Sequence, residues 1–87
     1  MDKSGAFKER VWEWAEEIGV SPKEIHIREM TNKWASCSTR GRLTFAKDLL
    51  DESNDKQKEV IVHELLHLRY PDHGRMFKAT LKGYLSK

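Results

Sequence analysis

The 87 residues suffice for one small domain with a modest hydrophobic core, and they exclude a second domain. The 16 basic and 14 acidic side chains give a net charge of +2, with an excess of positive charge from Arg69 onward. No apolar run approaches the about 20 residues that span a bilayer, and the single cysteine, Cys37, excludes an intrachain disulfide. We therefore expect one cytoplasmic domain over residues 1–87 that binds no membrane.

Apolar residues at helical spacing predict a first helix over residues 6–18. We interpret it as a packing helix, with Ser4 as its N-cap and Gly19 at its end. The Ser-Pro pair that follows breaks the chain, and alternating apolar and polar residues then predict a strand over residues 24–30. The apolar positions of the helix are Phe7, Val11, Trp14, Ala15 and Ile18.

Two further strands are predicted over residues 33–38 and 42–46. The three residues between them suit a hairpin loop, because Gly41 can adopt the positive φ angle that such a loop needs. Leu43 and Phe45 are expected to face the core. With the preceding strand, these two complete a predicted three-stranded antiparallel sheet.

Two helices are predicted after the strands. Asn54 and Gln57 have the spacing of a capping box, which predicts a helix over residues 54–69. The proline after it ends this helix, because the residue before a proline avoids helical geometry. Asp72 is the expected cap of a last helix over residues 73–85. The apolar residues of that helix are Met76, Phe77, Leu81, Tyr84 and Leu85. The predicted class is therefore α+β.

The most informative motif is His63-Glu64-Leu65-Leu66-His67. Two histidines four residues apart on a helix point the same way, so they can bind one metal ion while Glu64 lies beside it as a general base. The surrounding residues are apolar, and burying these polar groups costs several kcal/mol unless they are paired or ligated. We predict one zinc ion per chain. The alternative, core histidines satisfied by hydrogen bonds, is disfavoured by this cost.

His73 is the best candidate for a third ligand. Many HExxH peptidases use a downstream glutamate, but no glutamate follows Glu64 here, and Asp72 is the only later acid. Pro71 turns the chain, so His73 can fold back toward the other two histidines. Three ligands leave one position for water, which is typical of a hydrolytic zinc site. A surface histidine at a helix start is the alternative.

Other candidate residues are less specific. Cys37 is a good zinc ligand in principle, but a small residue alternating with Ala35 in a strand is more typical of core packing. Trp34 is expected in the core and His26 at the surface. No substrate-binding residue or oxyanion stabiliser can be identified; the side chains considered are Tyr70, Arg75 and Tyr84.

Three segments resemble the YgjP-like zinc metallopeptidase domain family, which is related to the SprT and WLM groups. Residues 33–38 (KWASCS) resemble its Trp-Gly-Ser-Cys-Ser strand, residues 62–68 (VHELLHL) its HELxHL helix, and residues 72–77 (DHGRMF) its Asp-His turn. The resemblance extends from about Ile27 to Phe77.

This resemblance implies a minimal zincin-like domain with His63, His67 and His73 as zinc ligands and Glu64 as the catalytic acid/base. The sequence departs from the family pattern at three positions, where Ala35 replaces a preferred glycine, Gly74 a serine and Lys78 a tryptophan. These departures leave the metal site intact. They bear on the substrate and on the level of activity.

The leading interpretation is a zinc metallopeptidase acting on a peptide or protein, with residues 42–46 as an edge strand that aligns the substrate. The alternative is a metal-dependent endoribonuclease or nucleotide hydrolase, because the His-x3-His-x5-His run also resembles YbeY-like enzymes. That family usually has glycine where Glu64 stands, so nucleic acid is the less favoured partner. A third interpretation is a non-catalytic zinc-stabilised module. The sequence indicates no oligomeric state.

Overall fold

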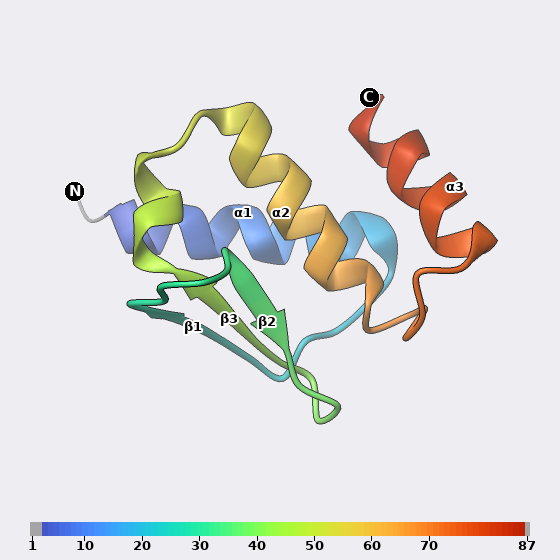
Figure 1. The fold of residues 1–87 in the computed structure, drawn as a ribbon, viewed down its shortest axis with the longest axis horizontal. Coiled ribbons are helices and arrows are strands. Elements are labelled where there is room, and N and C mark those ends of the chain that lie inside the picture. Colours follow the sequence, from blue (N-terminus) through green and yellow to red (C-terminus); the bar gives the residue numbers. More distant parts are fainter. Residues whose placement is uncertain (1–2, 87) are drawn as a thin grey trace.

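The computed structural model describes residues 3–86, in which three α-helices, one short 3-10 helix and a three-stranded sheet are found (Figure 1). The predicted domain boundaries include Met1, Asp2 and Lys87, which lie outside the described residues. The elements in chain order are α1 (Lys3–Ile18), β1 (Glu24–Arg28), β2 (Ala35–Cys37), β3 (Arg42–Ala46), η1 (Lys47–Asp51), α2 (Asn54–Leu66) and α3 (Arg75–Leu85).

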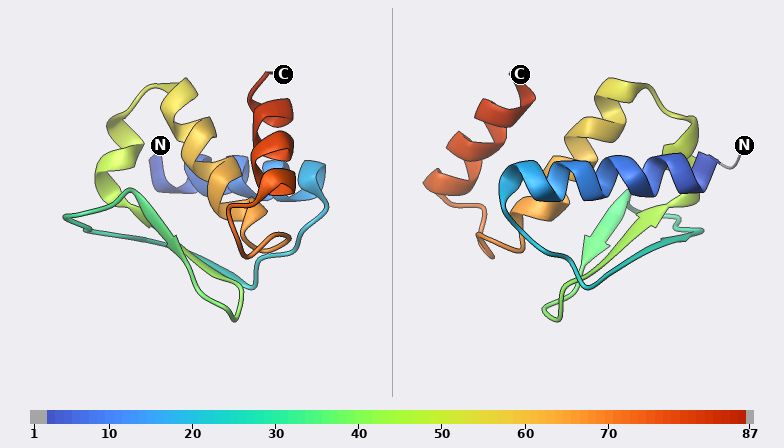
Figure 2. Two further views of the ribbon diagram at one scale, coloured as in Figure 1. Left: turned by 45° about the vertical axis from the view of Figure 1, so that its right-hand side comes forward. Right: turned by 180° about the vertical axis from the view of Figure 1, so that it is seen from behind.

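All three helices lie on one side of the sheet, with α3 next to α2 (Figure 2). The core lies between the central strand and the two helices packed over it. Leu43 and Phe45 of β3 are fully buried, as predicted, and Phe45 makes an edge-to-face contact with Phe7 of α1 at a centroid distance of 5.1 Å. The side chains contributed by α2 are Val60, Ile61, Val62, Leu65 and Leu66.

The strand order is β1-β3-β2, so β3 occupies the centre of the sheet. β2 pairs antiparallel with β3, with Ala35 opposite Phe45. β1 runs parallel to β3, with Glu24 opposite Arg42. The α+β class is therefore confirmed, but the prediction of a fully antiparallel sheet is wrong for the β1–β3 pair. Alternation along a strand reports which face is buried, and it carries no information on the direction of the partner.

The loop between β2 and β3 has the predicted hairpin geometry. Gly41 has a φ of 89°. The hydroxyl of Ser38 accepts hydrogen bonds from the backbone N–H groups of Arg40 at 3.3 Å and Arg42 at 3.0 Å. A Cβ at position 41 would lie 3.4 Å from the flexible side chain of Lys23, at the close end of ordinary van der Waals contact. The positive φ, rather than a lack of space, therefore favours glycine there.

The start of α2 differs from the predicted capping box. Ser53 is the N-cap, and its hydroxyl accepts from the N–H of Lys56 at 3.2 Å. Gln57 is instead buried against η1, a short helix that no sequence pattern predicted. Its side-chain amide donates to three carbonyl oxygens of residues 49–52 and accepts from the guanidinium of Arg10. Gln57 thus joins α1, η1 and α2 through one side chain.

The other helix ends also shift. α1 begins at Lys3, so Ser4 lies inside the helix, whereas Gly19 ends it with a φ of 85° as predicted. α2 ends at Leu66, three residues early, because residues 67–69 form a turn with i→i−3 bonds such as Leu68 N–H to Leu65 O at 3.0 Å. Gly74, and not Asp72, precedes α3. Within residues 3–86, no helix combines the length and apolar character needed to cross a membrane.

Candidate metal centre

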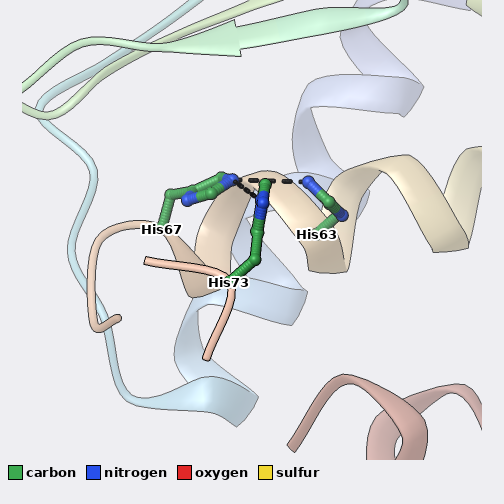
Figure 3. A group of neighbouring side chains, drawn as sticks. All are labelled: His63, His67 and His73. Carbon is green, nitrogen blue, oxygen red and sulfur yellow. Dashed lines mark hydrogen bonds between the residues drawn. The ribbon is translucent and has the colours of Figure 1, made fainter. Parts of the chain in front are cut away.

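Two of the three predicted ligands stand one turn apart at the end of α2. His63 lies in its last turn, His67 is its C-cap, and their Nε2 atoms are 3.3 Å apart. His73 belongs to the segment that turns back between α2 and α3. Its Nε2 lies 2.9 Å from that of His67 (Figure 3). The ligand atoms of all three histidines lie within 4.8 Å of one another. The structure therefore brings together the three histidines that the sequence analysis singled out.

Hydrogen bonding alone satisfies this arrangement poorly. The Nε2 of a neutral imidazole is either a donor or an acceptor of one hydrogen bond. The Nε2 of His67 faces both other Nε2 atoms, so one proton or one lone pair must serve two close contacts. A single cation between the three rings accepts all three lone pairs at once. The donor set therefore fits one divalent metal ion bound by imidazoles.

A buried aromatic side chain supports the three rings. The ring of Phe77, in the first turn of α3, lies 5.1 Å from His63, 5.0 Å from His67 and 4.8 Å from His73 between centroids. Its side chain is 2 % exposed. The sequence placed Phe77 among the apolar residues of the last helix and at the end of the 72–77 family motif, without predicting its contact with the histidines. The available signal was its position four residues after His73, which places the two side chains near each other at a helix start.

Burial shifts the pKa of two residues of the centre. It lowers the pKa of His63, and the electrostatic effects of the neighbouring His67 and His73 lower it further, against the opposing effect of Glu59. Neutral imidazole, the form that binds metals, is thereby favoured. Burial also raises the pKa of Glu64, while Lys33 and His73 oppose this shift.

Glu64 borders a pocket of about 200 Å³ that His67 of the histidine cluster also lines. The pocket is lined by Glu64 and His67 from α2, by Pro71, and by Cys37, Ser38 and Thr39 at the end of β2. A group bound in this pocket therefore lies near both the Glu64 side chain and one member of the histidine cluster, His67. No sequence pattern predicted that Cys37, Ser38 and Thr39 line a pocket.

Cys37 does not belong to the ligand cluster found among residues 3–86. It is half-buried against the core, as its alternation with Ala35 predicted, and burial together with the charge of Glu64 raises the pKa of its thiol. His26 lies on β1 next to Glu24, away from the cluster. Tyr84 packs edge-to-face on Trp14 of α1 at 6.3 Å, so it does not reach the centre.

The sheet corrects one expectation about substrate alignment. Residues 42–46 form β3, which has a partner on each side and is not an edge strand. The edges are β1 and β2, and β2 is the one that leads into the pocket beside Glu64. The prediction of the edge strand was wrong because the order of strands in a sheet depends on which distant strands pair. The local sequence pattern does not encode that pairing.

Comparisons with known proteins agree with this architecture. The sequence model of the YgjP-like, metallopeptidase domain family matches residues 3–87. Among solved structures, the crystal structure of the metallopeptidase zymogen of Pyrococcus abyssi abylysin is similar, with a TM-score of 0.73 and 24% identity. The similarity covers 85% of this chain and 75% of that one, and it confirms the zincin-like fold. No curated protein matches the sequence.

Proposed function

We propose that this chain, which belongs to the YgjP-like metallopeptidase domain family, is a zinc-dependent peptidase of the cytoplasm. The family makes it a metal-dependent hydrolase. The observation that carries the finer proposal is the convergence of three imidazole Nε2 atoms beside a pocket that Glu64 borders. In this proposal His63, His67 and His73 hold the zinc, and Glu64 is the catalytic acid/base.

The spacing of the three nitrogens suits zinc. With Zn–N bonds of about 2.0–2.1 Å, two ligands of a tetrahedral ion lie about 3.3 Å apart. The observed separations are 3.3 Å for His63–His67 and 2.9 Å for His67–His73. Small rotations of the rings therefore suffice to seat the ion. Three protein ligands also leave the fourth position open, as in catalytic zinc sites.

The residues of the chain have separate roles in this proposal. Bound zinc supplies Lewis acidity, which activates water and polarises the carbonyl of the scissile bond. Glu64 takes the proton from the attacking water and returns it to the leaving amine, because its carboxyl borders the space where both must sit. The edge of β2 that has no strand partner aligns an extended peptide through backbone hydrogen bonds.

Metal binding is the first expected result. After loading with zinc and removal of excess metal, the protein should hold about one zinc per chain by elemental analysis. His73→Ala should weaken zinc binding by about two to three orders of magnitude without abolishing it. This follows if the about 10–16 kcal/mol of a four-ligand structural site is shared equally among its ligands. The His63–His67 pair remains in that variant.

His26→Ala is the matched control, because His26 lies outside the ligand cluster. A competition titration with a chromophoric chelator measures the affinities of all three proteins. Absence of zinc after loading, or equal losses in the two variants, would remove the proposed ligand set.

Turnover tests the proposed reaction. The zinc-loaded protein should cleave members of a mixed panel of fluorogenic peptides and should lose this activity when a chelator is added. The same samples are assayed on single-stranded RNA. Cleavage of RNA without cleavage of any peptide would replace the peptidase by the ribonuclease interpretation. Zinc binding without turnover on either substrate would favour a non-catalytic module.

A further inference from the structure

A groove of about 520 Å³ opens next to the metal centre, and its charged walls are basic. It is lined by His73, Gly74, Arg75, Lys78, Ala79 and Lys82. His73 is shared, because it is both the third proposed zinc ligand and one end of this groove. A peptide bound across the metal centre would therefore place the residues next to its cleaved bond in this groove.

The three long basic side chains lie on one face of α3. Arg75, Lys78 and Lys82 follow each other at spacings of three and four residues, which places them along one stripe of a helix. The stripe is about 10 Å long at a rise of 1.5 Å per residue. This length corresponds to about three residues of an extended peptide at 3.3–3.6 Å each. The groove thus matches a short peptide segment in length.

The positive charge of this stripe is not compensated locally. Arg75, Lys78 and Lys82 are all exposed, and the ion pairs found within residues 3–86 involve other basic residues. The first turn of α3 contains no acidic residue, so the positive end of the helix dipole adds to the stripe. Three uncompensated cations around one groove attract carboxylates.

We propose that this groove binds acidic side chains of the substrate, so that the enzyme prefers peptides with aspartate or glutamate within about three residues of the cleaved bond. The proposal rests on the proposed peptidase function and adds the substrate class. Charge complementarity carries it, together with the shared position of His73 and the matching length of the stripe.

The groove suits a peptide better than a nucleic acid. Proteins that bind single strands combine a basic track several phosphates long with aromatic side chains on which bases stack. No phenylalanine, tyrosine or tryptophan lines this groove, and its one ring, that of His73, belongs to the proposed metal centre. The basic surface is also local, because α1 exposes four acidic side chains, Glu9, Glu13, Glu16 and Glu17. An acidic peptide is therefore the favoured occupant.

Peptide binding to a variant that cannot cleave measures the contribution of the groove separately from catalysis. Three labelled octapeptides that differ only in one Asp-Asp, Asn-Asn or Lys-Lys pair are titrated into zinc-loaded Glu64→Gln protein and followed by fluorescence anisotropy. At low salt the Asp-Asp peptide should bind about fivefold more tightly than the Asn-Asn peptide, since exposed ion pairs contribute little individually. This preference should shrink as salt screens the charges.

A charge-matched pair of double variants locates the effect. Lys78→Gln/Lys82→Gln should reduce the Asp-Asp over Asn-Asn preference to less than twofold. Lys8→Gln/Lys47→Gln removes the same charge from α1 and η1 and should leave the preference unchanged. Equal affinities for the three peptides, or a preference that survives loss of Lys78 and Lys82, would overturn the proposal. Tighter binding of octauridine than of the Asp-Asp peptide would also overturn it.

Cleavage of the same peptides by the zinc-loaded wild-type protein separates the two proposals. Faster hydrolysis of the Asp-Asp peptide supports both. Cleavage without any acidic preference refutes the groove proposal and leaves the peptidase standing. Preferential binding of the Asp-Asp peptide with no cleavage of any peptide refutes the peptidase and leaves the acidic-binding groove standing.

Discussion

Glu64→Gln should lower kcat/KM for a cleaved peptide by about 10²–10⁴-fold, the range expected when a general acid/base is lost. Glutamine keeps the shape of the side chain but cannot take up the proton of the attacking water. The carboxyl borders the pocket without belonging to the ligand cluster, so the zinc content should stay at about one per chain. Steady-state kinetics and elemental analysis on the same preparation measure both quantities.

Glu59→Gln is the matched control for this substitution. Glu59 lies on the same helix, is exposed and pairs with Lys56 at 3.7 Å, and among the groups that shift the pKa of His63 it has the smallest effect. Its variant should hydrolyse the peptide within about twofold of the wild-type rate. If Glu64→Gln were as active as Glu59→Gln, Glu64 would have no part in the mechanism, and the ribonuclease interpretation would gain support.

Removal of zinc should strongly destabilise the protein. A ligand that binds only the folded state at a thousandfold excess over its Kd contributes about 4 kcal/mol. For a domain of this size, each kcal/mol corresponds to about 4–8 °C in Tm. Chelation should therefore lower the Tm by about 15 °C or more. Thermal unfolding followed by circular dichroism, with and without chelator, tests this expectation.

When zinc is chelated, backbone amides should lose their protection from hydrogen exchange first at residues 70–77. His73 is the only proposed ligand in that segment, whereas α1 and the sheet share their own buried contacts, such as the Phe7–Phe45 pair. Amide hydrogen exchange should therefore quicken first between Tyr70 and Phe77 and later in α1. A uniform loss of protection, or none at all, would contradict a scaffold that is preformed apart from its metal-bound turn.

The sequence predicted the proximity of the three histidines, but it did not predict the pairing of the strands. The HExxH spacing fixes His63 and His67 on one face of a helix, because helical geometry is local. His73 required a further argument, from the turn at Pro71 and the absence of a later glutamate, and the structure places it within the cluster. Leu43 and Phe45 were predicted correctly because alternation reports burial directly.

The errors concern properties that depend on distant partners. The parallel β1–β3 pair and the edge position of β2 follow from the path between strands, which no local pattern specifies. Ser53 and Asn54 are adjacent residues that both cap helices well, so propensity alone does not choose between them. Gln57 is buried because carbonyls of η1 happen to surround its amide. The contact of Phe77 with all three histidines likewise depends on how α3 docks.

The docking of α3 against α2 determines when the three histidine side chains lose their conformational entropy. Phe77 contacts all three imidazoles, so the rings are confined as α3 packs against α2 and before any ion arrives. Ordering a free side chain typically costs about 0.5–1.5 kcal/mol, and a ring already held by a neighbour avoids most of this cost on binding. In the proposed metal centre, part of the affinity for the ion would thus come from an apolar residue that does not bind it.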